Sequence, residues 1–172
     1  MVLLAAHAYA VLVTQTHSKP HRPISDPEVA SVRKFVQGFY DWYVPRALKN
    51  GDTELLALKS KAASFAPELR SSLLEDWKAS SKNKDEIVGL DFDPFLNSQD
   101  PYPRYTVATI KHQGQNWLVG VYGFSPGEKP TEPAVTAKVE KGKRGWRFTN
   151  FLYGKGDNLL GTLRQLKHDR KH

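Results

Sequence analysis

A change in hydrophobic periodicity at residues 90–103 limits the folds open to this chain. Before this segment, apolar residues recur every three or four positions, which is typical of helices that bury one face. After it, apolar and polar residues alternate, which is typical of half-buried strands. The segment itself reads LDFDPFLNSQDPYP, and its three prolines favour an ordered crossover over a helix or a strand. Helices followed by a sheet indicate an α+β fold.

Three helices are expected before the crossover. The first begins with a capping box formed by Ser25 and Glu28, and its aromatic stripe is expected to end at Val44, because a proline follows. A short helix is expected over residues 53–63, and a third is expected to begin at Pro67. A chain of 172 residues fits one domain that is large enough to bury a core.

Four strands are expected after the crossover, over residues 104–112, 117–124, 134–140 and 146–153. The connections between them contain no room for a crossover helix, so the sheet is predicted to be an antiparallel meander. Asp157 or Asn158 is expected to cap a last helix. The predicted architecture is therefore a set of N-terminal helices packed on a curved four-stranded sheet, with a short C-terminal helix closing the domain.

Composition divides the chain into four parts. Residues 1–14 are uncharged and contain the small-residue pattern Ala8–Ala10, which is typical of the apolar core and cleavage region of a secretory signal. The positive charge that usually precedes such a core is missing, so the signal is either truncated or replaced by a buried N-terminal strand or helix. Residues 15–25 are expected to form a linker, residues 26–167 a single domain and residues 168–172 a charged tail. The signal predicts a periplasmic or secreted protein, and no segment is long enough to be predicted as transmembrane.

The net positive charge lies entirely in the last fifth of the chain. Residues 1–137 contain 15 Lys/Arg and 15 Asp/Glu, whereas residues 138–172 contain 10 Lys/Arg and 3 Asp/Glu, which gives 10 − 3 = +7. A basic end of this kind either remains a solvated surface or binds an anionic polymer, a membrane surface or an acidic partner. Nucleic acid is not the expected partner, because no recognised nucleic-acid motif or aromatic platform accompanies the charge.

The crossover groups oxygen-bearing side chains that suit either a cation or a partner protein, namely Asp91, Asp93, Asn97, Gln99 and Asp100. Calcium is not predicted, because a proline interrupts the run and both the loop glycine and the bidentate glutamate of a calcium loop are missing. In the structural interpretation, Asp93 makes a turn and Asp100 caps backbone donors. No metal or cofactor is therefore predicted, and the five residues are candidates for a partner-binding loop.

A second candidate site is a cavity that could open between the first helix and the sheet. Aromatic residues are expected to line its mouth, namely Tyr40, Tyr43, Trp117, Tyr122 and Trp146. Their hydroxyl and indole N–H groups could orient a small ligand, but the same residues could equally fill a solid core. Only one of the six histidines lies in the domain and no catalytic motif is present, so an enzyme is not expected. The alternative is an enzyme of the isomerase or dehydratase type that uses a buried acid, which predicts a deep polar cavity with a carboxylate of raised pKa.

Three sequence segments carry a resemblance to a known family: FYDWY at residues 39–43, DxDPFLxxQD at 91–100, and GWRFxNFxY with GDxLL at 145–160. Together they resemble a family of small, mostly exported bacterial proteins known as domain of unknown function 3828, over roughly residues 27–166. The resemblance implies a cystatin-like or nuclear-transport-factor-2-like cone, in which a curved sheet wraps around the first helix. It also implies a looser similarity to immunity proteins that neutralise injected toxins. That family has no established activity, so the expected function is a non-catalytic binding protein of the bacterial cell envelope, which binds a protein partner or a small ligand.

Overall fold

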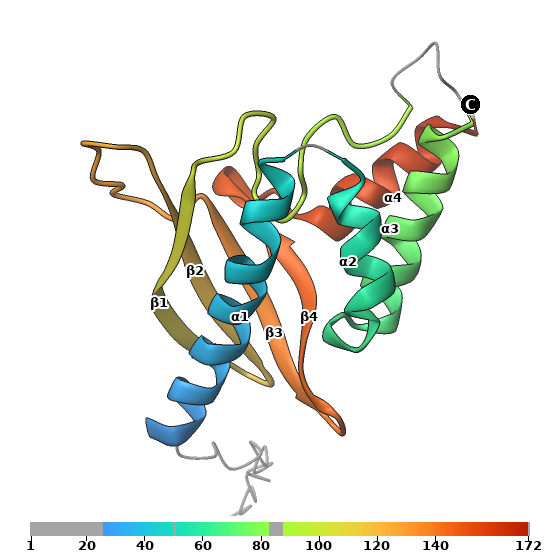
Figure 1. The fold of residues 1–172 in the computed structure, drawn as a ribbon. Coiled ribbons are helices and arrows are strands. Elements are labelled where there is room, and N and C mark those ends of the chain that lie inside the picture. The colour runs from blue at the N-terminus through green and yellow to red at the C-terminus, as the bar shows by residue number, and fades with distance from the viewer. Residues whose placement is uncertain (1–25, 50, 83–87, 172) are drawn as a thin grey trace, which may run out of the picture.

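The computed structural model of this protein describes residues 26–49, 51–82 and 88–171 (Figure 1). It confirms the α+β class, with N-terminal helices, a four-stranded antiparallel meander and a C-terminal helix. None of the described helices is long and apolar enough to cross a membrane. The predicted signal, the linker and the capping residue Ser25 lie outside the described residues. The signal stays a prediction, which N-terminal sequencing of the exported protein would test by cleavage near Ala10.

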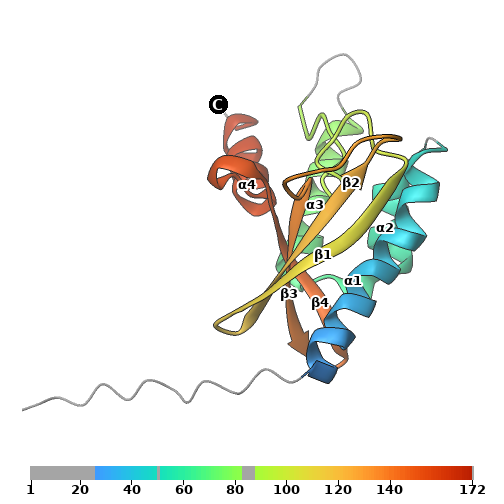
Figure 2. The same cartoon turned by 90° about the vertical axis from the view of Figure 1, so that its left-hand side faces the viewer.

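Helix α1 (Asp26–Ala47) lies along one face of the sheet, as Figure 2 shows. Most of its apolar stripe is buried, as the periodicity predicts, while Val29, Phe35 and Trp42 are half-buried against the core. The prediction that it ends at Val44 is wrong, because the helix continues through Pro45 to Ala47. A proline costs one helical hydrogen bond. The last turn survives because the Leu48 N–H donates to the Val44 carbonyl at 3.0 Å and the Arg46 side chain donates to a carbonyl one turn earlier at 2.6 Å.

The sheet has the order β1-β2-β3-β4, with strands β1 (Arg104–Gln113), β2 (Asn116–Phe124), β3 (Val135–Gly142) and β4 (Gly145–Leu152). These bounds lie within a few residues of the predicted ones. A bulge in β1 falls between Val107 and Thr109. There, Arg33 of α1 donates to the Val107 carbonyl at 2.7 Å, and Gln37 accepts from the Val107 N–H at 2.8 Å. Helix α1 therefore bonds to the backbone of an edge strand that would otherwise expose unpaired groups.

The helix predicted over residues 53–63 is divided into α2 (Thr53–Ser60) and the short 3₁₀ helix η1 (Ala62–Ser64), and α3 (Pro67–Ser80) follows. Between η1 and α3, the Ala66 N–H donates to the Phe148 carbonyl at 2.7 Å, which fixes this connection beside β4. After β4, the 3₁₀ helix η2 (Gly154–Gly156) leads to α4 (Leu159–Asp169). Of the two predicted capping residues, Asn158 caps the N-terminus of α4, because its side chain accepts a hydrogen bond from the Gly161 N–H at 3.0 Å.

The crossover fills the core between α1 and the sheet. Phe95 and Leu96 are both 0% exposed. The Phe95 ring packs 5.5 Å from Phe39 of α1 and 5.1 Å from Phe151 of β4, measured between ring centroids. The Tyr40 hydroxyl donates to the Phe95 carbonyl at 2.8 Å, so the buried end of this tyrosine is satisfied. The space between α1 and the sheet is thus packed with side chains at this point rather than hollow.

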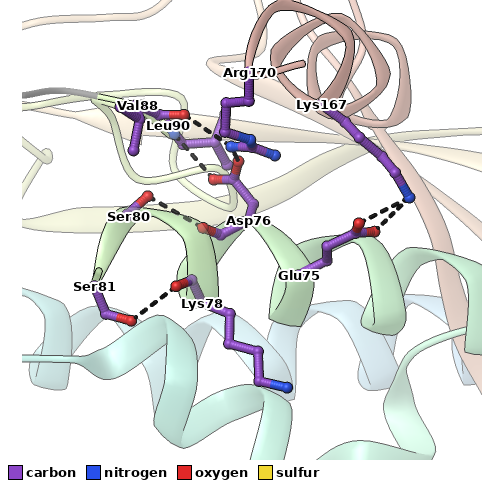
Figure 3. Close-up of polar contacts among 9 residues, drawn as sticks. All are labelled: Glu75, Asp76, Lys78, Ser80, Ser81, Val88, Leu90, Lys167 and Arg170. Atoms are coloured by element: carbon purple, nitrogen blue, oxygen red, sulfur yellow. Dashed lines mark hydrogen bonds and ion pairs between the residues drawn. The ribbon is translucent and has the colours of Figure 1, made fainter. Parts of the chain in front are cut away.

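A buried ion pair joins α4 to α3 and to the start of the crossover (Figure 3). Arg170 donates to one carboxylate oxygen of Asp76 at 2.5 Å and to the Val88 carbonyl at 2.8 Å, while the other Asp76 oxygen accepts from the Leu90 N–H at 3.0 Å. The Asp76 side chain is 5% exposed. A Cβ at Gly89, just before the crossover, would collide with the Ser80 hydroxyl oxygen and lie 2.9 Å from an Asp76 carboxylate oxygen, so a larger residue there would displace these side chains. We call Asp76, Arg170 and the two backbone groups that they bind the α3–α4 clamp.

Candidate functional site

A pocket of about 760 Å³ lies where the end of α1, the start of α2, helix α3 and the crossover meet. Its wall contains the apolar side chains of Trp77, Leu90 and Phe92. Its acidic side chains are Asp52, Glu54, Asp91 and Asp93. No lysine, arginine or histidine occurs among the described residues that line it. The pocket therefore combines negative charge with apolar surface, and we call it the acidic pocket.

Glu54 is the most perturbed acid of the acidic pocket. Its pKa is raised from the ordinary value of 4.5 to about 8, mainly by burial and then by the nearby carboxylates of Asp93 and Asp76. Glu54 lies in the first turn of α2, where the exposed N–H groups of a helix favour negative charge, so desolvation outweighs that effect. Among the described residues, none donates a hydrogen bond to its carboxylate. Ionisation of Glu54 therefore opposes folding, and this cost is absent below pH 4.5 and grows as the pH rises toward 8.

Asp93 is held in place by three hydrogen bonds. One carboxylate oxygen accepts from the Tyr43 hydroxyl at 2.8 Å, and the other accepts from the Phe95 and Leu96 N–H groups at 2.9 and 3.1 Å. Burial raises the pKa of Asp93, and these hydrogen bonds to the charged form only partly offset it. The predicted turn at Asp93 is confirmed, and it fixes a carboxylate rigidly at the wall of the acidic pocket.

The other crossover candidates divide into two groups. Asp91 and Gln99 line the acidic pocket with Asp93, and the Gln99 amide donates to the Asp91 carboxylate at 3.3 Å. Asn97 has a φ of 52° and donates to the Ala134 carbonyl at 3.0 Å, so it ties the crossover to the residue before β3. The prediction that Asp100 caps backbone donors is wrong. No described backbone N–H donates to its carboxylate, and its backbone N–H and carbonyl bond to the Ser98 hydroxyl instead.

The five aromatic candidates do not gather around one hollow. Tyr40 and Tyr43 are each 1% exposed in the core, and Tyr43 reaches the acidic pocket. Trp117 and Trp146 pack against each other with centroids 6.0 Å apart, away from the crossover. Tyr122 lies on the opposite face of β2 from Trp117, because side chains alternate along a strand. Of the five, Tyr43 is the one placed beside the acidic pocket.

Glu54 was not predicted as a site residue. It belongs to a short helix whose role depends on what packs against it, so the sequence around it does not mark it as buried. The available signal was an acid in the first turn of an apolar helix, TELLALKS, directly after an Asn–Gly turn. Within the described part of the chain, no three His, Asp or Glu side chains lie close enough together to hold a metal ion.

The sequence segments that resemble the family of unknown function contribute residues to the core and to the crossover. Phe39, Tyr40 and Tyr43 of its first segment, together with Asp93 and Phe95 of its second, meet in the contacts described above. Membership of the family nevertheless stays a prediction. Comparison of the chain with protein-family models, curated proteins and solved structures gives no match.

Proposed function

We propose that this protein is a non-catalytic binding protein whose acidic pocket binds an amine or guanidinium group, carried by a small ligand or by a partner protein. The observation that carries this proposal is the Glu54 carboxylate, which lies beside Asp93 with a raised pKa and without a hydrogen-bond donor among the described residues. A cation placed between the two acids would stabilise both in their charged forms. The binding energy would come from relieving an electrostatic cost that the folded protein otherwise carries.

The apolar wall of the acidic pocket narrows the class of ligand. Trp77, Leu90 and Phe92 line the same space as the acids, so a ligand with an apolar portion next to its cation would bury surface there. An indole ring also attracts cations through its π face. A hydrophobic amine fits this combination better than a fully hydrated inorganic cation.

Binding of 2-phenylethylamine should strengthen as the pH rises from 6 toward 8. The amine stays protonated over this range, whereas Glu54, with a pKa of about 8, must lose its proton to pair with it. Below that pKa, the association constant is expected to rise by up to about tenfold per pH unit, because one proton is released on binding, and to level off above it. Isothermal titration calorimetry in buffers of different ionisation enthalpy measures both the affinity and the released proton.

Three comparisons make this experiment decisive. Glu54→Gln should weaken binding and remove its pH dependence, whereas Glu132→Gln, the same change in the exposed β2–β3 loop, should leave both unaltered. The neutral analogue 2-phenylethanol should bind far more weakly. Equal binding of the amine and the alcohol, or an unchanged pH profile in Glu54→Gln, would overturn the proposal.

One observation favours a second candidate function. A carboxylic acid with a pKa of about 8 is protonated at neutral pH and could act as a general acid, which is the feature expected of the enzyme alternative. Binding is the better-supported function, because the described lining residues include no cation or histidine to stabilise charge that develops in a transition state. Proton NMR of the amine after long incubation with the protein separates the two, since turnover would change its spectrum.

A further inference from the structure

A second pocket, of about 840 Å³, lies between the β3–β4 hairpin and the segment that connects α2 to α3. Its cationic side chains are Arg70, Lys141, Lys143, Arg144 and Arg147. The apolar part of its wall contains Phe65 and Pro67. No acid occurs among the described residues that line it. We call it the basic pocket, and it lies at the opposite end of α2 from the acidic pocket.

The structure divides the basic C-terminal part of the chain into two groups. Acids of α3 pair with Arg164 and Lys167 of α4, at 3.7 and 2.8 Å, and with Arg170, the residue directly after α4, at 2.5 Å. Those charges are compensated inside the molecule. The hairpin is different, because Lys143 and Arg144 at its tip form no ion pair with any described residue.

The remaining cations of the basic pocket are only partly compensated. Lys141 lies 3.5 Å from Glu28, and Arg147 lies 2.6 Å from Glu140. The Nε of Arg70 donates to the Leu58 carbonyl at 2.8 Å, which orients its guanidinium without neutralising it. Five cations against two neighbouring carboxylates leave an excess of positive charge in one open space. Such an excess attracts anions.

The wall of the basic pocket is held in a fixed shape. Gly142 pairs with Gly145 across a two-residue turn, and Gly145 has a φ of 114°, which a residue with a side chain rarely adopts. On the other side, the Ala66 N–H donates to the Phe148 carbonyl of β4 at 2.7 Å. The hairpin and the α2–α3 connection are thus joined directly, so ligand binding would not have to order them first.

We propose that the basic pocket binds a ligand carrying two or more phosphate or sulfate groups. Arginine suits tetrahedral oxyanions, because its planar guanidinium can donate two parallel hydrogen bonds to one phosphate or sulfate group. The flanking lysines add positive charge without such a fixed hydrogen-bond geometry. Several cations spread over a pocket of about 840 Å³ favour a multiply charged ligand over a single small anion. This site is independent of the acidic pocket, so either proposal can fail without the other.

Inorganic tripolyphosphate is the probe for this proposal, and a sulfated hexasaccharide distinguishes sulfate from phosphate as the preferred group. Calorimetry should show binding in 50 mM salt and at least tenfold weaker binding in 200 mM salt. The double variant Lys143→Gln/Arg144→Gln should weaken tripolyphosphate binding about tenfold or more. Both substitutions lie in a solvent-exposed turn, and circular dichroism checks that the fold is retained.

The matched control is Arg164→Gln/Lys167→Gln, which removes the same charge from α4. The Arg164 side chain is 67% exposed and that of Lys167 is 49% exposed, and both are already paired with acids of α3. Tripolyphosphate affinity should therefore change less than twofold. Equal weakening by both double variants would show attraction to net charge rather than a site. Absence of binding in 50 mM salt would also overturn the proposal, and tight binding of an acidic peptide instead of either oxyanion would reassign the pocket.

Discussion

Replacing Arg170 by methionine should lower the free energy of unfolding by about 3 to 5 kcal/mol, although Arg170 lies next to the end of the chain. The substitution leaves the Asp76 carboxylate, which is 5% exposed, without its cation. It also removes the hydrogen bond to the Val88 carbonyl. Methionine keeps most of the length of the side chain, so lost packing contributes little. Urea denaturation followed by tryptophan fluorescence measures the change.

Helix α4 provides the control for the α3–α4 clamp. Lys167→Met removes an ion pair of 2.8 Å whose side chains are 49% and 52% exposed, and it should cost less than about 1 kcal/mol. Combining Arg170→Met with Asp76→Leu should restore much of the lost stability, since no buried charge then remains. If Arg170→Met cost no more than Lys167→Met, the interpretation of Asp76 as a buried charge would be wrong.

Phe95→Ala is expected to reduce the free energy of unfolding by about 3 to 5 kcal/mol, which would make the crossover part of the core rather than a surface loop. Phe95 is 0% exposed, and the centroid of its ring lies 5.5 Å from that of Phe39 and 5.2 Å from that of Tyr43. Removing it opens a cavity among rigid aromatic side chains that cannot collapse around it. Thermal and urea denaturation give the same quantity by two routes.

A second substitution keeps this prediction testable if Phe95→Ala fails to fold. Phe95→Leu retains most of the volume and should cost clearly less. Leu56→Ala serves as the surface comparison, because Leu56 is 46% exposed on α2, and its cost should stay below about 1 kcal/mol. A cost for Phe95→Ala as small as that of Leu56→Ala would contradict the role of the crossover in the core.

Local patterns predicted the elements of this fold well. The strands follow the two-residue alternation, because one face of each packs on α1 and the core. Errors arose where tertiary packing overrode a local rule. The proline rule predicts an end at Val44, yet α1 keeps a further turn, since Tyr43 and Val44 are buried and the next carbonyls accept from the Arg46 side chain and the Leu48 N–H.

The candidate site was predicted only in part. Asp91, Asp93 and Gln99 lie in one short segment, so their sequence neighbourhood already indicated a shared location. Glu54 joins them from a separate helix through packing that no local pattern encodes. The α3–α4 clamp is harder still to predict, because Asp76 and Arg170 are 94 positions apart and each resembles an ordinary surface charge in its own segment.

The opposite lining charges at the two ends of α2 have a kinetic consequence. Acids gather near its first residue and cations near the segment after its last, so the electrostatic potential changes sign over the length of one short helix. Diffusing anions and cations would be steered to different ends of the molecule before any contact forms. Both association rates would fall as salt screens the fields, with a Debye length of about 10 Å at 0.1 M. A molecule arranged in this way approaches a charged surface with a preferred orientation.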